Sequence, residues 1–271
     1  MDWESVATML TTIRSFLINV QFQTSIPIHL QLPMDDKHIR RAVETFPLLG
    51  LFQGMILTGI LYFLMETPLS TVAVAFFLWI ATIIISGGLY LDGWMDASDA
   101  FFSYKEPAKR VEIMADPHIG AFGVISLFVL LSSRFFFIYE TVSLITRQTY
   151  VLVLLLPFFS KIVMGMLLIK LPTAKRTGLA YFFQKRVKKQ SSYSYFISFF
   201  LVMVPILIFS KVMVIPVVLM IIVALFIYLI LRKKLSSWFG GITGDLLGAS
   251  VEGTELMLWM IIWLSHYFVT G

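Results

Sequence analysis

The sequence predicts an all-α protein: a polytopic bundle of about seven transmembrane helices, preceded by an amphipathic helix at the membrane surface. Of its 271 residues, 58% are hydrophobic and 14% are charged, which is more apolar surface than a soluble domain of this size buries. Apolar runs of about 20 residues, the length that spans the hydrocarbon core, recur with short polar gaps between them. We therefore expect residues 1–271 to form a single integral-membrane domain, with residues 46–268 as the bundle.

Residues 1–45 are predicted to form a cytoplasmic or interfacial segment outside the bundle. A helix at its start would carry a row of apolar side chains along one face, which is typical of a helix that lies in the membrane interface. An ordinary packing helix has the same periodicity and remains an alternative. The apolar positions are Val6, Leu10, Ile13, Phe16, Leu17 and Val20.

The remaining apolar stretches define the expected spans in order. Residues 195–231 are too long for one helix, and Lys211, between Pro205 and Pro216, predicts a tight turn. The fifth and sixth spans are therefore expected to form a helical hairpin. The seven spans cover residues 46–65, 70–91, 119–139, 150–169, 195–210, 212–231 and 246–268.

The distribution of Lys and Arg predicts the orientation in the membrane. If the N-terminus is inside, the cytoplasmic segments hold 17 of the 21 Lys and Arg residues, as expected because basic residues favour cytoplasmic loops. This topology accounts for the net charge of +5, so nucleic acid is not an expected partner; the lipid bilayer is. A homo-oligomer is left open. The cytoplasmic segments are residues 1–45, 92–118, 170–194 and 232–245.

Three aspartates at the end of the second span, Asp92, Asp96 and Asp99, are the first candidates for chemistry. Their spacings of four and three place them on one face of a helix. Like charges so close together repel each other unless a cation or a shared proton compensates them. Because the chain has no cysteine, oxygen and imidazole ligands remain, and carboxylates favour Mg²⁺ bound together with substrate phosphates. The alternative is a solvated acidic helix start.

Two further acidic segments are expected near the same site. Asp116 and His118 precede the third span. His118 is a candidate for substrate binding, although a capping or interface role is the commoner one for a single histidine there. Asp245, Glu252 and Glu255 share one quadrant of the last span. Acidic groups at membrane depth face the interior of a bundle, so this face is expected to meet the aspartates of the second span.

Basic residues provide candidates for binding a phosphorylated substrate. Arg134 and Lys161 fall within spans and should face inward, where they either neutralise the acids or bind a phosphate. Lys175 and Arg176, beside Gly178, are the better substrate candidates in the basic run that follows the fourth span. The rest of that run is more typical of contact with anionic lipid.

Taken in order, these segments resemble the cobalamin synthase family, the adenosylcobinamide-GDP ribazoletransferases. The resemblance spans most of the chain and depends on five blocks in the family's order. The blocks are FPLLG at 46–50, GGLYLDGWMDASDAFFS at 87–103, EIMADPHIGAFGV at 112–124, AKRTGLAYFF at 174–183 and GGITGDLLGASVEGTE at 240–255.

The resemblance implies a Mg²⁺-dependent phosphotransferase of the bacterial or archaeal cytoplasmic membrane, with its active site facing the cytoplasm. In this reaction α-ribazole or its 5′-phosphate displaces GMP from adenosylcobinamide-GDP and forms adenosylcobalamin or its phosphate. On this interpretation Asp92, Asp96 and Asp99 hold the metal. Asp96, Asp116 and Asp245 are the catalytic candidates, with Asp116 or Asp245 as the base.

The sequence departs from the family pattern GGLHLDG, because Tyr90 stands where the family has histidine. Two other functions remain alternatives to this one. Membrane CDP-alcohol phosphotransferases share Asp-Gly followed by spaced aspartates, but Trp94 replaces the Ala that should follow Gly93. A cation-coupled transporter would place its acidic cluster near mid-membrane in repeated halves, and no repeat is visible.

Overall fold

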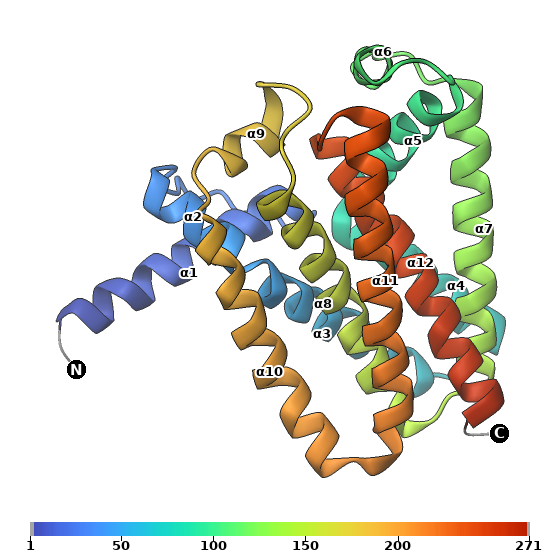
Figure 1. The fold of residues 1–271 in the computed structure, drawn as a ribbon. Helices are drawn as coiled ribbons and strands as arrows, with labels where there is room; N and C mark the ends of the chain where they lie inside the picture. The colour runs from blue at the N-terminus through green and yellow to red at the C-terminus, as the bar shows by residue number, and fades with distance from the viewer. Residues whose placement is uncertain (1–2, 270–271) are drawn as a thin grey trace.

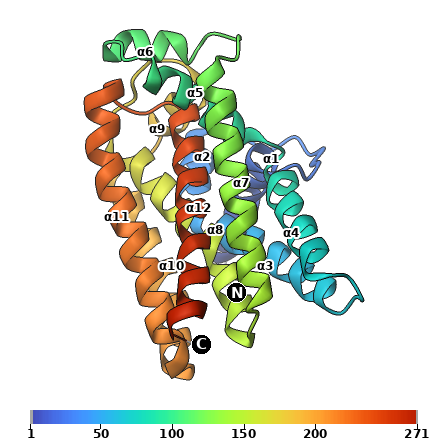
Figure 2. The same cartoon turned by 90° about the vertical axis from the view of Figure 1, so that its right-hand side faces the viewer.

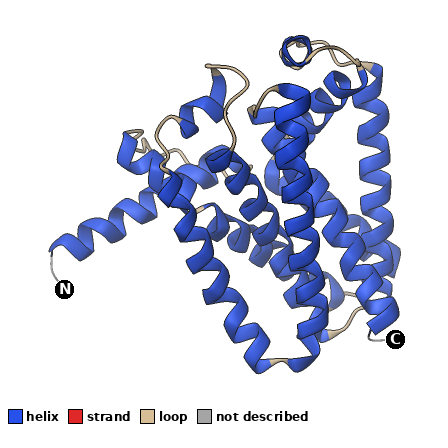
Figure 3. Ribbon diagram, viewed as in Figure 1, coloured by secondary structure: helices blue, strands red, loops and turns tan. Residues whose placement is uncertain are grey.

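The structure is a computed structural model that describes residues 3–269, so the first two and last two residues of the predicted domain lie outside the described residues. Within that range it contains twelve α-helices and no β-strand. Figure 3 colours the described chain by secondary structure and shows helices joined by loops. The prediction of an all-α fold is therefore confirmed.

Six helices of the described chain are long and apolar enough to cross a membrane. A seventh span results if α4 (Thr71–Ser86) and α5 (Leu89–Phe102) are taken together, so the prediction of about seven spans is confirmed. The six are α3 (Phe46–Met65), α7 (Ala121–Ser143), α8 (Arg147–Lys170), α10 (Ser192–Phe209), α11 (Val214–Phe239) and α12 (Gly244–Val269).

The second predicted span does not run straight through residues 70–91. Helix α4 ends at Ser86, and α5 leaves it at an angle of 85°. Gly87 and Gly88, with φ of 62° and 78°, make the bend because glycine adopts the left-handed region without the strain of a Cβ atom. Helix α5 therefore packs against the ends of α7 and α12 instead of extending α4 (Figures 1 and 2).

The expected hairpin is confirmed: α10 and α11 are joined by the short turn η2 (Lys211–Met213). Helices α7, α11 and α12 run side by side, with α8 behind them in the view of Figure 2. Helix α8 is largely buried. Three short helices lie at the same end of the bundle as α5, and we call this end the site end. They are α6 (Pro107–Ile113), α9 (Gly178–Gln184) and η1 (Lys189–Ser191).

Helix α1 (Trp3–Gln23) confirms the predicted N-terminal helix, and its two halves differ. Near its end Asn19 donates hydrogen bonds to the Ala42 carbonyl oxygen, at 2.7 Å, and to Thr45 Oγ1, at 3.0 Å. These bonds hold α1 to α2 (Asp36–Glu44) and the start of α3. The first half projects from the bundle (Figure 1) and leaves Leu10 and Ile13 exposed. The second half is thus a packing helix, and the first offers an apolar face.

Candidate active site

The site is built where α5 crosses the start of α12. A Cβ atom on Gly93 would lie 2.6 Å from the Asp245 carbonyl oxygen, and one on Gly248 would lie 3.2 Å from Tyr90 Cα. Small residues therefore let the two backbones touch, as in close helix pairs in membranes. This contact brings the aspartate face of α5 to Asp245, as expected from the sequence.

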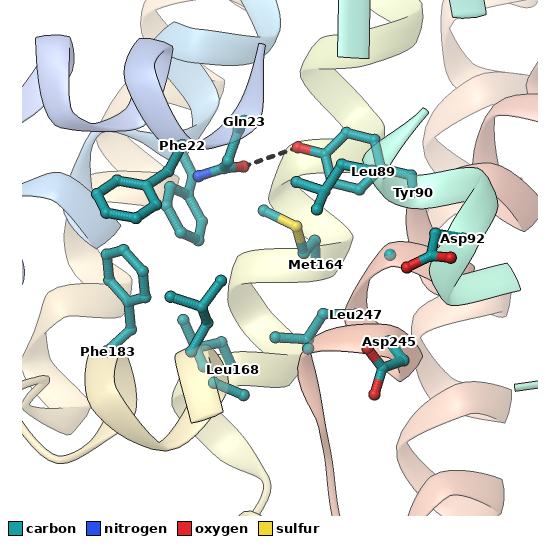
Figure 4. Close-up of a pocket in the computed structure, with 15 residues that line it drawn as sticks. Phe22, Gln23, Leu89, Tyr90, Asp92, Met164, Leu168, Phe183, Asp245 and Leu247 are labelled. Atoms are coloured by element: carbon teal, nitrogen blue, oxygen red, sulfur yellow. Dashed lines mark hydrogen bonds between the residues drawn. The ribbon is translucent and has the colours of Figure 1, made fainter. Parts of the chain in front are cut away.

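A cavity opens beside this crossing (Figure 4). Asp92 and Asp245 lie on one side of it, whereas Phe22 and Phe183 lie on the other. The cavity thus combines a carboxylate wall with an apolar wall, a composition suited to a ligand with one charged and one apolar end. Its lining comes from α1, α3, α5, α8, α9 and α12 and includes Phe46, Leu89, Tyr90, Met164, Leu168 and Leu247.

The carboxylates at the crossing influence one another. Asp96 is half-buried on α5. The carboxylates of Asp92, Asp245 and Asp99 lie near enough to oppose its negative charge, whereas Lys175 favours it. Negative charge therefore accumulates here in excess of the basic side chains, which favours a bound cation.

Lys175 reaches this cluster because two loops at the site end are joined. The Ala174 amide donates to the Ile242 carbonyl oxygen, and the Ile242 amide to that of Pro172, both at 2.9 Å. These bonds tie the loop after α8 to the residues before α12. Lys175 consequently lies near enough to Asp96 for their opposite charges to attract each other, whereas Arg176 is exposed to solvent.

Asp99 has a different environment from Asp92 and Asp96. Its Oδ2 accepts a hydrogen bond from the Gly120 amide at 2.9 Å, and its Oδ1 accepts one from the Gly123 amide at 2.8 Å. Both oxygens therefore satisfy amides at the start of α7 that have no partner within the helix. Asp99 joins α5 to α7, and its predicted role as a metal ligand stays a prediction.

The donor chemistry of the cluster suits Mg²⁺ only if the substrate contributes ligands. Among the described residues, no three acidic or histidine side chains converge closely enough to form a complete metal site. Mg²⁺ is usually held by one or two carboxylates together with waters and substrate phosphates. Asp92, Asp96 and Asp245 fit that pattern by residue type and by their shared position at the crossing.

Asp116 and His118 lie apart from the cavity, in the exposed loop between α6 and α7. The His118 amide and ring nitrogen approach Asp116 Oδ1 at 3.0 and 2.7 Å. These hydrogen bonds hold the pKa of the Asp116 carboxyl below its usual value, which weakens it as a proton acceptor. Neither side chain lines the cavity.

Arg134 and Lys161 face inward, as predicted, and both are fully buried. Arg134 donates to Glu252, and Lys161 Nζ lies 4.1 Å from the centre of the Tyr90 ring. Glu255 accepts a hydrogen bond from Ser160 at 2.9 Å. The structure thus shows the pairing alternative for Arg134, and substrate binding by either cation stays a prediction.

The aromatic wall of the cavity was not predicted from the sequence. Phe46 and Phe183 lie inside the matched blocks FPLLG and AKRTGLAYFF, so their place in those blocks was the available indication. Phe22 and Gln23 end the amphipathic helix, and nothing in the local pattern marks them. Their role depends on how α1 packs against the bundle.

Comparisons with known proteins identify related chains. Residues 15–263 match the family model described as cobalamin-5-phosphate synthase. A relative from Geobacillus sp. (strain WCH70), named adenosylcobinamide-GDP ribazoletransferase, is 38% identical over 94% of this chain and 97% of its own length. A relative of the same name from Halalkalibacterium halodurans is 31% identical over 96% of this chain and 98% of its own length. One from Clostridium tetani is 32% identical over 95% of this chain and 98% of its own length. No solved structure matches the chain.

Proposed function

The chain belongs to the cobalamin-5-phosphate synthase family, and on that premise we propose that it is a Mg²⁺-dependent adenosylcobinamide-GDP ribazoletransferase. Its substrates are adenosylcobinamide-GDP and α-ribazole or α-ribazole 5′-phosphate, and its products are GMP and adenosylcobalamin or its phosphate. The observation that carries the proposal is the shared cavity: Asp92 and Asp245, from two blocks of the matched region, line it together.

The transfer forms one P–O bond and breaks another. A ribose hydroxyl oxygen of ribazole attacks the phosphorus that bears cobinamide, and the bond from that phosphorus to the bridging oxygen breaks. GMP leaves with the electron pair of that bond, and the hydroxyl proton passes to a carboxylate. When bound, Mg²⁺ would neutralise charge on the diphosphate and stabilise the leaving GMP.

Asp92 and Asp96 are the residues proposed to hold the metal against the diphosphate, with Lys175 beside them to bind a phosphate oxygen. Asp245 is the preferred base because it lines the cavity. Asp116 is the weaker candidate, since its carboxylate is already hydrogen-bonded to His118 in an exposed loop.

The proposed setting is the cytoplasmic membrane, with the site end facing the cytoplasm, where nucleotide substrates are present. The apolar helices support a membrane location, and the concentration of Lys and Arg in the site-end loops supports this orientation. The CDP-alcohol phosphotransferase and transporter alternatives have no comparable support from the relatives found.

The test is GMP release from adenosylcobinamide-GDP and α-ribazole by the purified protein in lipid nanodiscs, with and without Mg²⁺. We expect Asp96→Asn and Asp245→Asn each to lower kcat by at least about 100-fold, a common size for loss of a charged group that acts in the transition state. Asp116→Asn should stay within about threefold of the native rate, because its carboxylate lies outside the cavity.

Each outcome has a definite meaning. Folded native protein that releases no GMP would refute the proposed function. GMP release that does not depend on Mg²⁺ would refute the metal role while leaving the transfer intact. A large loss in Asp116→Asn with full activity in Asp245→Asn would reverse the assignment of the base.

A further inference from the structure

The apolar half of the cavity contains three phenylalanine rings from three separate elements. The Phe183 ring centre lies 6.3 Å from that of Phe22 and 6.4 Å from that of Phe46, with interplanar angles of 90° and 61°. Edge-to-face rings of this kind form a rigid corner. Because all three line the cavity, the corner presents aromatic surface to whatever enters.

One amide lies beside this corner and is held in a defined orientation. Tyr90 donates a hydrogen bond of 2.9 Å to Gln23 Oε1, drawn as the dashed line in Figure 4. With its oxygen turned to Tyr90, the Gln23 amide group points its nitrogen to the side of the phenylalanine rings. The NH₂ group of Gln23 therefore lies at the edge of the apolar wall as a hydrogen-bond donor.

We propose that this corner, formed by Phe22, Phe46, Phe183 and Gln23, binds the aromatic base of α-ribazole. The inference deepens the proposed function and rests on it. The base, 5,6-dimethylbenzimidazole, is a flat, apolar bicyclic ring system with one free ring nitrogen, which is a hydrogen-bond acceptor. Three rings supply the aromatic contact, and Gln23 Nε2 donates to the ring nitrogen.

The arrangement of the whole cavity agrees with this assignment. Asp92 and Asp245 lie across the cavity from Phe22 and Phe183 (Figure 4). A nucleoside whose base occupies the corner would point its ribose toward these carboxylates, where the hydroxyl must lose its proton. The guanine of the other substrate is a poorer occupant, because its several donors and acceptors would be left without partners against the phenylalanine wall.

In this proposal Tyr90 is a positioning residue for the Gln23 amide. Its hydroxyl hydrogen bonds to Gln23 instead of to a group at the reacting phosphorus, and its ring lies against buried Lys161. It orients the amide that recognises the base. This role requires no proton transfer through position 90, where the resemblance would place histidine.

Steady-state kinetics in nanodiscs test the aromatic corner. Phe183→Ala should raise KM for α-ribazole about tenfold or more, the size expected for loss of a buried aromatic contact, with kcat and KM for adenosylcobinamide-GDP within about twofold. Phe182→Ala is the matched control, since Phe182 is the neighbour on α9 that packs under Arg186 and does not line the cavity; its KM values should be native.

A nucleoside that lacks the acceptor tests the amide. The analogue is the α-linked N1-riboside of 5,6-dimethylindole, in which a C–H group replaces the free ring nitrogen. The native protein should show a KM about five- to tenfold higher for this analogue than for α-ribazole, as expected for one hydrogen bond. The double variant Gln23→Leu/Tyr90→Phe removes both partners of the buried bond and should treat the two nucleosides alike.

The possible results distinguish failure of the base-binding corner from failure of the proposed ribazoletransferase function. Native protein that releases no GMP refutes the proposed function itself. Native turnover with an unchanged KM for α-ribazole in Phe183→Ala refutes the corner, and so does a double variant that still prefers α-ribazole. If Phe183→Ala instead raises KM for adenosylcobinamide-GDP, the corner binds that substrate and the inference is wrong. Equilibrium dialysis of α-ribazole against each variant, without the second substrate, gives the same comparison if a variant loses turnover.

Discussion

Asp99 shows how three aspartates on one helical face can have different contacts. Asp92 lines the cavity and Asp96 lies among other carboxylates, but Asp99 accepts hydrogen bonds from the amides of Gly120 and Gly123. A carboxylate at a helix N-terminus stabilises the helix through these bonds and through the helix dipole. These contacts favour a structural role for Asp99 over the predicted role as a metal ligand, which stays a prediction.

Asp99→Asn should separate the two roles. Because asparagine has one carbonyl oxygen in place of two charged ones, we expect the free energy of unfolding to fall by about 1 kcal/mol. The Mg²⁺ concentration for half-maximal GMP release should stay within about twofold of native. Thermal unfolding and Mg²⁺ titration check the two values. A Mg²⁺ midpoint raised by about tenfold or more, with native stability, would make Asp99 a metal ligand after all.

The sequence predicted part of this site well. The spacing of Asp92, Asp96 and Asp99 predicted their shared helix, and the acidic face of the last span predicted its meeting with that helix. The partners of Asp99 were not predictable, because Gly120 and Gly123 are brought to it only by tertiary packing of α7. Likewise, whether Arg134 pairs with Glu252 depends on the rotation of two helices, which residue type does not determine.

At the scale of elements, the crossing of α5 and α12 holds the site together. Gly93 lies against the backbone of Asp245, so the distance between the two helices is set by the absence of a side chain. Any added atom must move one helix away from the other. The position of Asp92 relative to Asp245 depends directly on this contact.

Gly93→Ala is therefore expected to lower both stability and activity. Its Cβ atom would meet the Asp245 carbonyl oxygen at 2.6 Å, an overpacked contact that costs about 1–3 kcal/mol. GMP release should fall by about tenfold or more as the carboxylates separate. Gly59→Ala on α3 is the control, because a Cβ there meets no atom within 4 Å and alanine favours a helix. Equal effects of the two substitutions in thermal unfolding and GMP release would argue against the crossing as the cause.

The bend between α4 and α5 could not be predicted from hydropathy, which indicates an apolar span but not a turn within it. The apolar stretch 70–91 predicted a continuous span, since its composition is apolar across Gly87 and Gly88. The turn depends on both glycines adopting left-handed φ values, which glycine permits but does not require. The neighbours of α1 could not be predicted either, because its apolar periodicity is compatible with both a membrane surface and a protein surface.

At the scale of the whole molecule, the two ends of the bundle differ in charge and in content. Loops with most of the Lys and Arg residues, the carboxylate cavity and the short helices α6 and α9 all lie at the site end. In the part of the chain that the structure describes, the connections at the opposite end are short, such as the turn between α3 and α4 near Glu66 and the η2 turn. Basic residues are retained on the cytoplasmic side during insertion, so this asymmetry predicts one orientation.

The absence of cysteine in the chain permits a direct test of that orientation. Lys185→Cys places a thiol at the exposed end of α9, and Glu66→Cys places one in the exposed turn at the opposite end. In intact cells a membrane-impermeant maleimide should label Glu66→Cys and leave Lys185→Cys unlabelled; in inverted membrane vesicles the pattern should reverse. Labelling of both after detergent solubilisation confirms that each thiol is accessible. Labelling of Lys185→Cys in intact cells would place the cavity outside, away from cytosolic nucleotide substrates, and the proposed cytoplasmic reaction would be wrong.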